Sequence, residues 1–454
     1  MDQDTIVAIA TAPGPGGIGI IRLSGKQALS IGISISSTNL QARHAHFSSF
    51  RDSAGQVLDT GICLFFPSPK SFTGEDVVEI QAHGGPIMLD LILRETCRLG
   101  ARLAKPGEFS QRAYLNNKID LAQAEAIADL INSTTEQAAL NASRSLQGIF
   151  SRKIDVLVAL VTELRVFVEA TIDFPEEEID FLGNSQVVTQ LQDIIEQFDA
   201  ITTETKQGSL LQEGMKLVIA GKPNAGKSSL LNALSGQDTA IVTAIAGTTR
   251  DVLRESIQID GMPLHIVDTA GLRDSDDIIE QEGIRRAWVE IESADRILLV
   301  IDESASSKDV LDSNELWQLA NQQLKRNIPV TIVSNKCDLS NHQPEVTLLG
   351  NITMVHLSAK TGAGVGLLKQ HLKTSMGYKE EGGGNFSARR RHLHALEQAK
   401  NFLLSGQQQL LQSGAGELLA EDLRLCQKSL GEITGAFSSD ELLGVIFSSF
   451  CIGK

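Results

Sequence analysis

The sequence predicts an α/β and α multidomain chain in which an α/β domain with a mostly parallel sheet interrupts a helical domain. Three observations support this. Apolar strand-like runs separated by Gly/Pro turns fill residues 1–118, and strands alternate with helices over 215–378. Strong helix formers dominate both 119–214 and 379–454, on either side of that alternation. The length of 454 residues suits about three domains.

The N-terminal segment, 1–118, is expected to form a compact α/β domain. Its apolar runs are bounded by turn clusters such as Ala12-Pro-Gly-Pro-Gly-Gly17 and His83-Gly-Gly-Pro86. We predict strands at 5–10, 18–23, 61–66 and 77–80, followed by a helix at 86–99.

The helical domain is expected to begin at 119–214 and to be completed by 379–454. Asp120 is a candidate N-cap, and apolar residues recur at helical spacing from Leu157 to Val168. The acidic run at 175–178 reads as a solvated turn, and Glu380–Asn385 reads as a flexible linker. The sequence therefore favours an insertion between two halves of one helical domain.

The inserted segment, 215–378, alternates strand and helix signals, which is typical of a doubly wound sheet. The predicted strands are 216–220, 254–259, 264–268, 296–301, 329–333 and 353–357.

Composition limits the classes of function. Forty Lys and Arg against 56 Asp and Glu give a net charge of −16, so nucleic acid could be bound only through a local basic surface. The five cysteines are scattered without metal spacing, which favours a reducing compartment. Because the chain has neither a membrane-spanning apolar run nor a basic leader, we predict a cytoplasmic protein with no membrane partner.

Residues 221–228, Gly-Lys-Pro-Asn-Ala-Gly-Lys-Ser, fit a phosphate-binding loop between an apolar strand and a helix. Backbone N–H groups and the helix dipole would hold an anion there. Lys227 would reach the β- and γ-phosphates, and Ser228 would ligate Mg²⁺. The predicted nucleotide contacts in this loop are Asn224, Ala225, Gly226, Lys227, Ser228 and Ser229.

Three further segments follow strands in the order that a GTPase requires. Asp268 ends a strand, so its carboxylate can hold Mg²⁺ through water. In Asn335-Lys336-Cys337-Asp338, an Asp338 carboxylate accepting two hydrogen bonds would select guanine, while Asn335 and Lys336 support the loop. Lys360, in Ser358-Ala359-Lys360, is equally a base contact or a surface lysine. The predicted contacts here are Asp268, Thr269, Ala270, Gly271, Asn335, Lys336, Asp338, Ser358, Ala359 and Lys360.

A candidate switch loop lies between the first two motifs, with Thr249 as the expected Mg²⁺ ligand when a γ-phosphate is present. Its residues are Thr243, Ala244, Ile245, Ala246, Gly247, Thr248 and Thr249. Leu272 stands where many small GTPases carry a water-orienting glutamine. The acidic stretch that ends at Glu280 could orient water instead. A monovalent cation near Asn224 could replace the arginine finger.

These motifs, together with Asn117–Ile131 and the terminal Cys451-Ile-Gly-Lys454, resemble the MnmE (TrmE) family of tRNA modification GTPases over essentially the whole chain. The resemblance implies an N-terminal domain that forms a homodimer and binds 5-formyltetrahydrofolate or a related folate. The implied folate contacts are Arg22, Glu79, Lys118 and Lys454.

The resemblance also implies the ions and catalytic groups of the GTPase domain. It implies K⁺ held by Asn224, Thr243, Ile245 and Thr248, and Mg²⁺ held by Ser228 and Thr249. Glu280 would position water, with Lys227 and Thr249 as further catalytic residues. Cys451 is open between a nucleophile and a small buried hydrophobe.

The function that we expect from this resemblance is K⁺-dependent GTP hydrolysis coupled to modification of the wobble uridine, U34, of certain tRNAs. An FAD-dependent MnmG (GidA) type partner, in a heterotetramer, would help add an aminomethyl or carboxymethylaminomethyl group at C5. The alternative is a regulatory or ribosome-assembly GTPase that binds RNA without modifying it. The basic run 389–392 could contact tRNA phosphates, although a solvated helix start is the favoured interpretation.

Overall fold

The structure is a computed structural model. It describes residues 4–173, 185–222, 224–235, 254–259, 261–268, 292, 294–304, 328–340, 342–350, 352–378, 385–437 and 440–453. The chain divides into two compact units, one of residues 1–128, 145–197 and 395–454, and the other of residues 129–144 and 198–394. The expected four-segment division remains a prediction. No helix among the described residues is long and apolar enough to cross a membrane.

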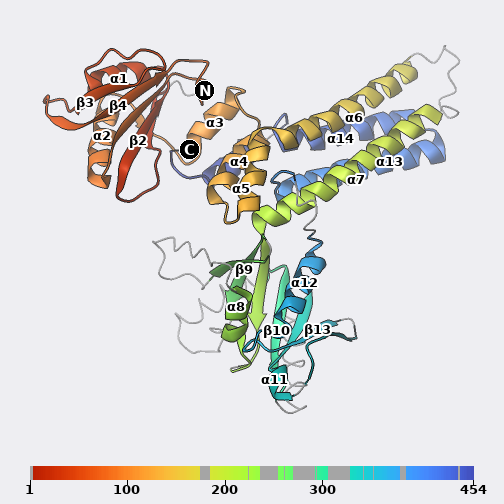
Figure 1. Cartoon of the computed structure of the whole chain (residues 1–454). Coiled ribbons are helices and arrows are strands. Elements are labelled where there is room, and N and C mark those ends of the chain that lie inside the picture. The colour runs from red at the N-terminus through yellow and green to blue at the C-terminus, as the bar shows by residue number, and fades with distance from the viewer. Residues whose placement is uncertain are drawn as a thin grey trace, which may run out of the picture. The chain divides into compact units, whose positions relative to one another are not determined.

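A six-stranded sheet in the order β3-β4-β5-β2-β1-β6 forms the N-terminal part of the first unit (Figure 1). All neighbouring strands are antiparallel except β1 and β6. Helices α1 and α2 share its core, in which Ile21, Ile31, Ile80 and Ile92 are buried. The elements are β1 (Ile6–Ile9), β2 (Gly16–Ser24), α1 (Ala28–Ser36), β3 (His46–Arg51), β4 (Val57–Phe66), β5 (Val77–Gly84), α2 (Pro86–Arg98) and β6 (Arg102–Leu103).

Helix α3 (Glu108–Leu115) is fixed to this sheet by an ion-pair network centred on Arg112. The Arg112 guanidinium bonds to Asp4 Oδ1 at 2.8 Å, Glu75 Oε2 at 3.0 Å and Glu108 Oε1 at 3.2 Å. Arg102 reaches the same Asp4 and Glu108 carboxylates, each at 2.7 Å. Two arginines therefore join the chain start, the 68–76 loop and α3.

The helical elements begin with the predicted cap. Asp120 Oδ1 accepts from the Gln123 N–H at 2.8 Å, and Gln123 Oε1 accepts from the Asp120 N–H at 3.0 Å, which is a capping box. Along α6, Leu157, Val161 and Val168 are fully buried, and α6 packs against α14. The helices are α4 (Leu121–Asn132), α5 (Glu136–Leu146), α6 (Ile149–Asp173), α7 (Ser185–Glu213), α13 (Arg390–Ser413), α14 (Gly416–Thr434) and α15 (Asp440–Ser448).

The second unit contains a seven-stranded sheet in the order β12-β13-β11-β10-β7-β9-β8. Its inner pairings are parallel, and only the edge strands β8 and β12 are antiparallel. The elements are β7 (Met215–Ala220), α8 (Lys227–Ser235), β8 (Arg254–Ile259), β9 (Met262–Asp268), β10 (Arg296–Asp302), β11 (Val330–Asn335), α11 (Cys337–Ser340), β12 (Val346–Leu349), β13 (Ile352–Leu357) and α12 (Val365–Met376).

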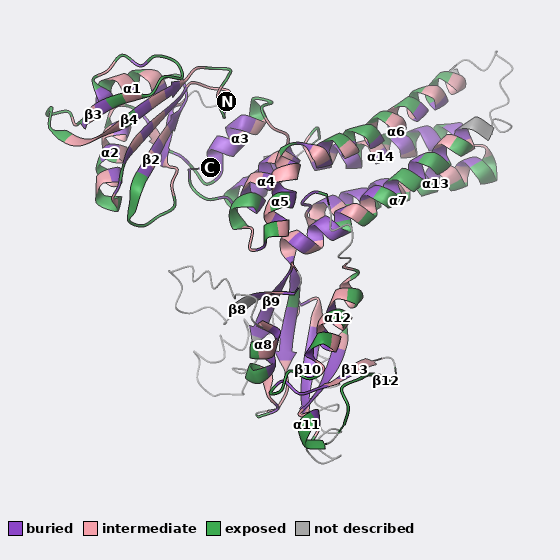
Figure 2. Ribbon diagram, viewed as in Figure 1, coloured by how far each residue is buried: buried purple, intermediate pink, exposed green. Residues whose placement is uncertain are grey.

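Both faces of this sheet carry buried apolar residues, as a doubly wound sheet requires. Leu217 and Ile219 of β7 belong to one core, and Val218 between them belongs to the other. The inner strands are buried through most of their length (Figure 2). The α/β and α multidomain class predicted from sequence is therefore correct.

The basic run at the start of α13 forms ion pairs within the second unit. Arg389 pairs with the buried Asp129 at 2.6 Å, and Arg390 pairs with Glu213 at 2.7 Å and Asp295 at 3.0 Å. His392 is 2% exposed and accepts the Arg389 N–H at Nδ1. The structure thus gives this run a structural role that neither sequence interpretation anticipated.

Candidate functional site

The predicted phosphate loop connects β7 to α8, and its backbone needs glycine at two close approaches. A Cβ on Gly221 would lie 2.3 Å from the Val300 carbonyl oxygen, and one on Gly226, whose φ is +95°, would lie 2.2 Å from Asn335 Nδ2. Asn224 also has a positive φ, +65°, and its side chain is exposed. Two motif positions are therefore dictated by the packing of neighbouring strands against the loop.

Lys227, the first residue of α8, folds back over the loop. Its Nζ donates to the carbonyl oxygens of Gly221 at 2.8 Å and Lys222 at 3.0 Å. Ser228 and Ser229 follow and are exposed. A positive charge and the N-terminal N–H groups of a helix thus lie together at the loop, which suits a phosphate.

The buried Asn335 amide joins the phosphate loop to the loop after β13. Its Nδ2 donates to the Ala225 carbonyl at 2.9 Å, and its Oδ1 accepts the Ala359 N–H at 2.9 Å. Asn335 is 2% exposed, so both bonds lie away from solvent. One side chain therefore fixes two of the predicted nucleotide loops relative to each other.

The neighbouring Lys336 has a φ of +71° and pairs with Asp302 at 2.5 Å. Burial alone would raise the pKa of Asp302, but Lys336 and two bonds from Ser304 outweigh it and lower that pKa. Asp338, the predicted guanine contact, lies in α11 and is exposed.

The loop after β13 combines buried and exposed positions. Ser358 and Ala359 are buried, and Lys360 is exposed. Hydrogen bonds from the Gly362 N–H to Ser358 and from the Ser358 N–H to Ala363 close the turn.

Several predicted residues lie outside the described part of the chain: Thr243, Ala244, Ile245, Ala246, Gly247, Thr248, Thr249, Thr269, Ala270, Gly271, Glu280 and Lys454. The backbone of Asp268 ends β9 and is paired in register with Ile219, two residues before the phosphate loop begins. The strand order therefore brings Asp268, Asn224–Ser229 and the Asn335 loop to one edge of the sheet.

The N-terminal sheet pairs two of the predicted folate contacts. Arg22 on β2 and Glu79 on β5 are register partners, and Arg22 Nη2 lies 2.8 Å from Glu79 Oε1. The guanidinium also lies 5.7 Å from the centre of the Phe72 ring and 5.9 Å from that of Phe109. The Arg22 guanidinium is thus bonded to a carboxylate and flanked by two aromatic rings.

Lys118 lies against the loop that carries Phe72. Its Nζ donates to the Pro69 carbonyl at 3.0 Å, and its stem is close to Gly74, where an added Cβ would be 3.3 Å away. The 68–76 loop therefore contacts both Arg22 and Lys118.

The C-terminal tail approaches the same strands. The Gly107 N–H donates to the Cys451 carbonyl at 3.4 Å, and a Cβ on Gly453 would lie 2.4 Å from the Ile9 carbonyl oxygen. Ile9 pairs with Ile21, the neighbour of Arg22. The chain end is thus seated beside the strand that bears Arg22.

Cys451 differs from the other cysteines because its side chain is exposed, so the interpretation of a small buried hydrophobe was wrong. Burial raises the pKa of the Cys63 and Cys426 thiols to about 12, which keeps them protonated and unreactive. All five thiols are free.

Two features near these sites were missed from sequence. A cavity of about 520 Å³ lies beside Lys118, lined also by Tyr114, Asp120, Asp155 and Gly435. Glu303, His342 and His356 also converge in the second unit. No local sequence pattern predicts the cavity or the Glu303, His342 and His356 group, because their residues come from separate elements.

The phosphate loop after β7 and the Asn335–Asp338 loop after β11, on a mostly parallel sheet, define a P-loop GTPase domain. Two family models cover most of the chain: "GTP-binding protein TrmE N-terminus" matches residues 5–118, and "MnmE helical domain" matches 121–451. The chain is 58% identical, over 453 residues and 99% of each chain, to the "tRNA modification GTPase MnmE" of Marinobacter nauticus. The chain therefore belongs to the MnmE (TrmE) family of tRNA modification GTPases.

Solved structures give weaker similarity. A GTP-binding protein of Sulfolobus solfataricus in complex with GDP is 17% identical, with a TM-score of 0.29, over 49% of this chain and 67% of that one. The FeoB G-domain of Methanococcus jannaschii is 21% identical, with a TM-score of 0.26, over 36% of this chain and 97% of that one.

Proposed function

We propose that this chain hydrolyses GTP to drive C5 modification of the wobble uridine, U34, of certain tRNAs. An FAD-dependent MnmG type partner would act with it, and a folate would give the one-carbon unit of the aminomethyl or carboxymethylaminomethyl group. The observation that carries the proposal is full-length similarity to a tRNA modification GTPase, in a chain whose phosphate and base loops are joined by Asn335. We place the protein in the cytoplasm as a homodimer formed through its N-terminal domain.

The residues of the nucleotide site suit GTP with Mg²⁺. Lys227 supplies positive charge at the phosphate loop, and the exposed Ser228 hydroxyl is free to face a metal ion beside it. Asp338 is exposed and can accept the paired donors of guanine, with Asn335 and Lys336 holding its loop. Thr249 would complete the Mg²⁺ shell, and Asp268 would support it through water. Catalysis of phosphoryl transfer to water then depends on positioning and charge neutralisation.

K⁺ is our proposed substitute for an arginine finger. The exposed Asn224 side chain, on a loop residue with positive φ, is a suitable oxygen ligand, with Thr243, Ile245 and Thr248 supplying others. Replacing K⁺ by Na⁺ at equal ionic strength should lower GTP turnover by about tenfold or more. Na⁺ has the same charge but is smaller, so oxygen ligands spaced for K⁺ would hold it poorly, and a correctly placed charge at this point is worth orders of magnitude in rate. Equal turnover in both salts would refute the K⁺ assignment.

The proposed folate site is formed by Arg22, Glu79 and Lys118, with Lys454 beyond the described chain. Two cationic side chains suit the carboxylates of a folate, and Glu79 suits a pterin N–H edge. Arg22 and Glu79 already bond to each other. A folate would therefore accept from the Arg22 N–H groups, and donate to the Glu79 oxygen positions, that this pair leaves unused. The exposed Cys451 is the proposed nucleophile at this end of the chain.

Analysis of tRNA nucleosides by mass spectrometry tests the modification. Cells that lack this chain should lose the C5-modified wobble uridines, and the intact gene should restore them. Unchanged C5-modified uridines in the deletion would refute the proposal and leave an RNA-binding regulatory or assembly GTPase.

A further inference from the structure

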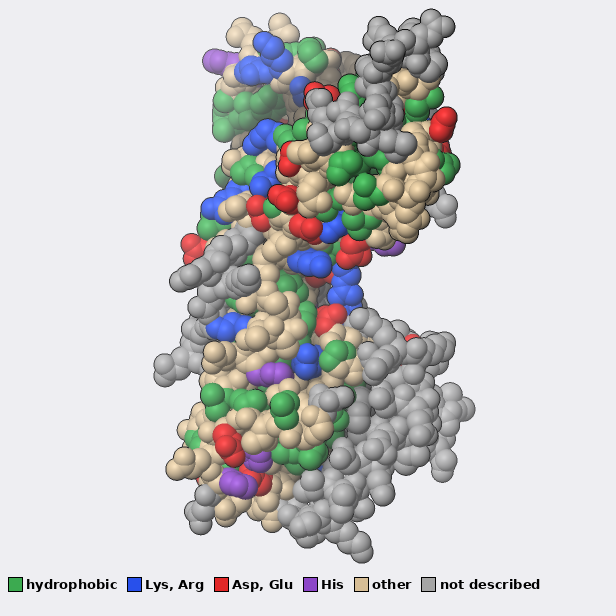
Figure 3. All heavy atoms as spheres, turned by 90° about the vertical axis from the view of Figure 1, so that its right-hand side faces the viewer, with side chains coloured by type: hydrophobic (Ala, Val, Ile, Leu, Met, Phe, Trp, Pro, Cys, Tyr) green, Lys and Arg blue, Asp and Glu red, His purple; other side chains and the backbone are tan. Residues whose placement is uncertain are grey.

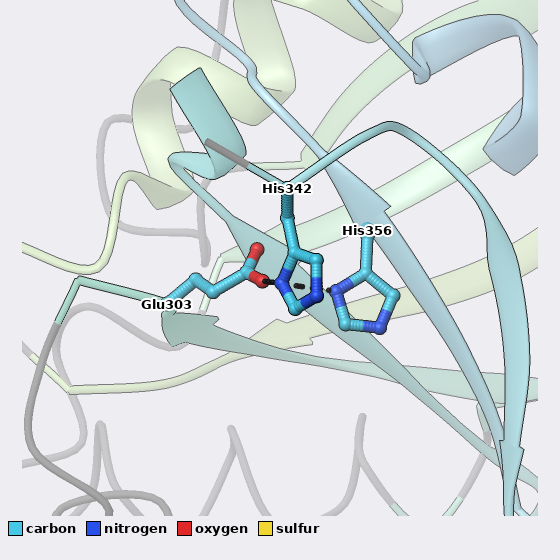
Figure 4. Close-up of side chains that lie close together, drawn as sticks. All are labelled: Glu303, His342 and His356. Carbon is cyan, nitrogen blue, oxygen red and sulfur yellow. Dashed lines mark hydrogen bonds and ion pairs between the residues drawn. The ribbon is translucent and has the colours of Figure 1, made fainter. Parts of the chain in front are cut away.

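Three side chains that the nucleotide site does not use converge in the second unit (Figure 4). Glu303 follows β10 directly, His342 follows α11, and His356 lies on β13. Because β10, β11 and β13 are parallel neighbours, residues at or after their carboxyl ends meet at one edge of the sheet. We call these three residues the Glu–His–His cluster.

The ligating atoms of the cluster are close enough for one ion. One oxygen or nitrogen from each residue lies within 4.8 Å of the others. Glu303 Oε1 is 3.2 Å from His356 Nδ1 and is in direct contact with His342 Nδ1. Ligands about 2.0–2.2 Å from a tetrahedral Zn²⁺ are about 3.3 Å apart. The Glu303–His356 separation already has this value, and His342, which is 59% exposed, has room to withdraw.

One buried oxygen of the cluster has no hydrogen-bond partner among the residues that the structure describes. Glu303 is 11% exposed, and its Oε2 is buried without a hydrogen bond. Such an atom calls for an explanation, and a bound cation is one of the ordinary ones. The two histidines bond to Oε1, so a cation that is held by both carboxylate oxygens would also satisfy Oε2.

The second ring nitrogen of His356 is also placed as in a metal ligand. Thr347 Oγ1 lies 3.2 Å from His356 Nε2, so that hydroxyl can accept the Nε2 proton while Nδ1 binds a metal. Figure 3 shows histidine and acidic side chains grouped on the surface of this unit. An ion can therefore reach histidines of this unit from solvent.

We propose that the Glu–His–His cluster binds a divalent transition-metal ion, with Zn²⁺ as the best match. Two imidazoles and one carboxylate form a familiar zinc donor set and leave a fourth position for water. Mg²⁺ and Ca²⁺ prefer oxygen ligands, so they should compete poorly.

The cluster is linked to the two predicted base-recognition loops by one hydrogen bond and by a short stretch of chain. The Glu303 N–H donates to the Asn335 carbonyl at 2.9 Å, and His356 lies two residues before Ser358. A metal that joins Glu303 to His342 and His356 would restrain the loops that hold Asn335 and Ala359. Bound Zn²⁺ should therefore slow the release of guanine nucleotide. This second effect rests on the proposed GTP binding, whereas metal binding does not.

Zinc binding to the full chain, stripped with a chelator, tests the site directly. Titration against a chromogenic zinc chelator should give one Zn²⁺ per chain, and excess Mg²⁺ should not displace it. His342→Ala, His356→Ala and Glu303→Gln should each weaken this binding at least tenfold. His342 is exposed and Glu303→Gln is nearly isosteric, so circular dichroism should show both variants folded.

The matched control is His83→Ala. His83 Nδ1 lies 2.8 Å from Asp59 Oδ1, which is the same imidazole–carboxylate contact without a second imidazole. This variant should bind Zn²⁺ as the unaltered chain does. Absence of stoichiometric zinc would overturn the site. So would cluster variants that bind Zn²⁺ as tightly as the unaltered chain does.

Release of a fluorescent GDP analogue tests the coupling. Saturating Zn²⁺ should slow release about threefold or more in the unaltered chain and have no effect in His356→Ala. Stoichiometric zinc with an unchanged release rate would overturn the coupling alone. Failure to bind GDP at all would instead count against the proposed GTPase function, with the zinc titration unaffected.

Discussion

Asn335 shows how one residue can organise a site without contacting the reacting atoms. Its amide uses both of its ends, one on the phosphate loop and one on the loop after β13. The glycine at 226 is required by the same packing, because a Cβ there would collide with the Asn335 amide nitrogen. The motif glycine and the motif asparagine therefore depend on each other.

Replacing Asn335 by alanine should weaken guanine nucleotide binding. Two buried hydrogen bonds are lost and the Ala225 and Ala359 groups are left unpaired, which costs about 1–3 kcal/mol. The expected rise in the Kd for GDP is roughly 5- to 150-fold, measured by calorimetry. Asn116→Ala is the matched control, since its Nδ2 bonds to the Thr73 carbonyl in the N-terminal domain. A similar loss in both variants would show that the effect is not local.

At the scale of elements, the Arg112 network holds α3 against the N-terminal sheet. Burial alone would raise the pKa of Glu108, but bonds from Arg102, the Lys105 N–H and Arg112 outweigh it and lower that pKa. The bond from Arg102 is the main cause that lowers the pKa of Asp4. The ionised carboxylates therefore stabilise the folded state.

Arg112→Gln should destabilise this part of the fold by roughly 2–3 kcal/mol. This is less than the roughly 3–5 kcal/mol of a fully buried pair, because Asp4 and Glu75 are partly exposed. Hydrogen exchange of peptides covering 4–9 and 108–115 measures the loss at pH 7. Arg98→Gln, which breaks an exposed pair with Glu95, should leave exchange unchanged.

The pH dependence of this effect has a definite sign. A carboxylate whose folded pKa is lowered stabilises the protein above its unfolded pKa, near 4.5 for Glu108, and the stabilisation is lost as the pH falls through the folded value. The difference in stability between Arg112→Gln and the unaltered chain should therefore be largest at pH 7 and become smaller below about pH 4.5. A difference that grows on acidification would contradict the network.

The elements also show what sequence could and could not predict. The phosphate loop was recognisable because its chemistry lies in consecutive residues. Helix α1 was missed because its Ile- and Ser-rich sequence has weak helix propensity, and burial of Ile31 and Ile35 overrides that propensity. The Glu–His–His cluster was missed because only the strand order brings together residues 39 and 53 positions from Glu303.

At the scale of the whole molecule, the proposed reactions belong to different units of the chain. The phosphate loop and its partners lie in residues 198–394, and Arg22, Glu79, Lys118 and Cys451 lie in the other unit. The chain passes from one unit to the other several times, so neither is a simple contiguous domain. A change at Cys451 should therefore abolish modification without altering GTP hydrolysis, whereas a change at the phosphate loop should abolish both.

Cys451→Ser should leave GTP turnover unchanged, because the tail contacts Gly107 and Ile9 in its own unit. It should abolish C5-modified wobble uridines, because a hydroxyl cannot replace a thiolate nucleophile at neutral pH.

Lys227→Ala should lose both GTP turnover and the C5-modified uridines, since removing the charge at the phosphate loop stops the hydrolysis that drives modification. Turnover assays on purified chains and nucleoside analysis of complemented deletion cells measure the two outcomes. Normal modification with Lys227→Ala would show that hydrolysis is not coupled to it, and normal modification with Cys451→Ser would remove the thiol from the chemistry.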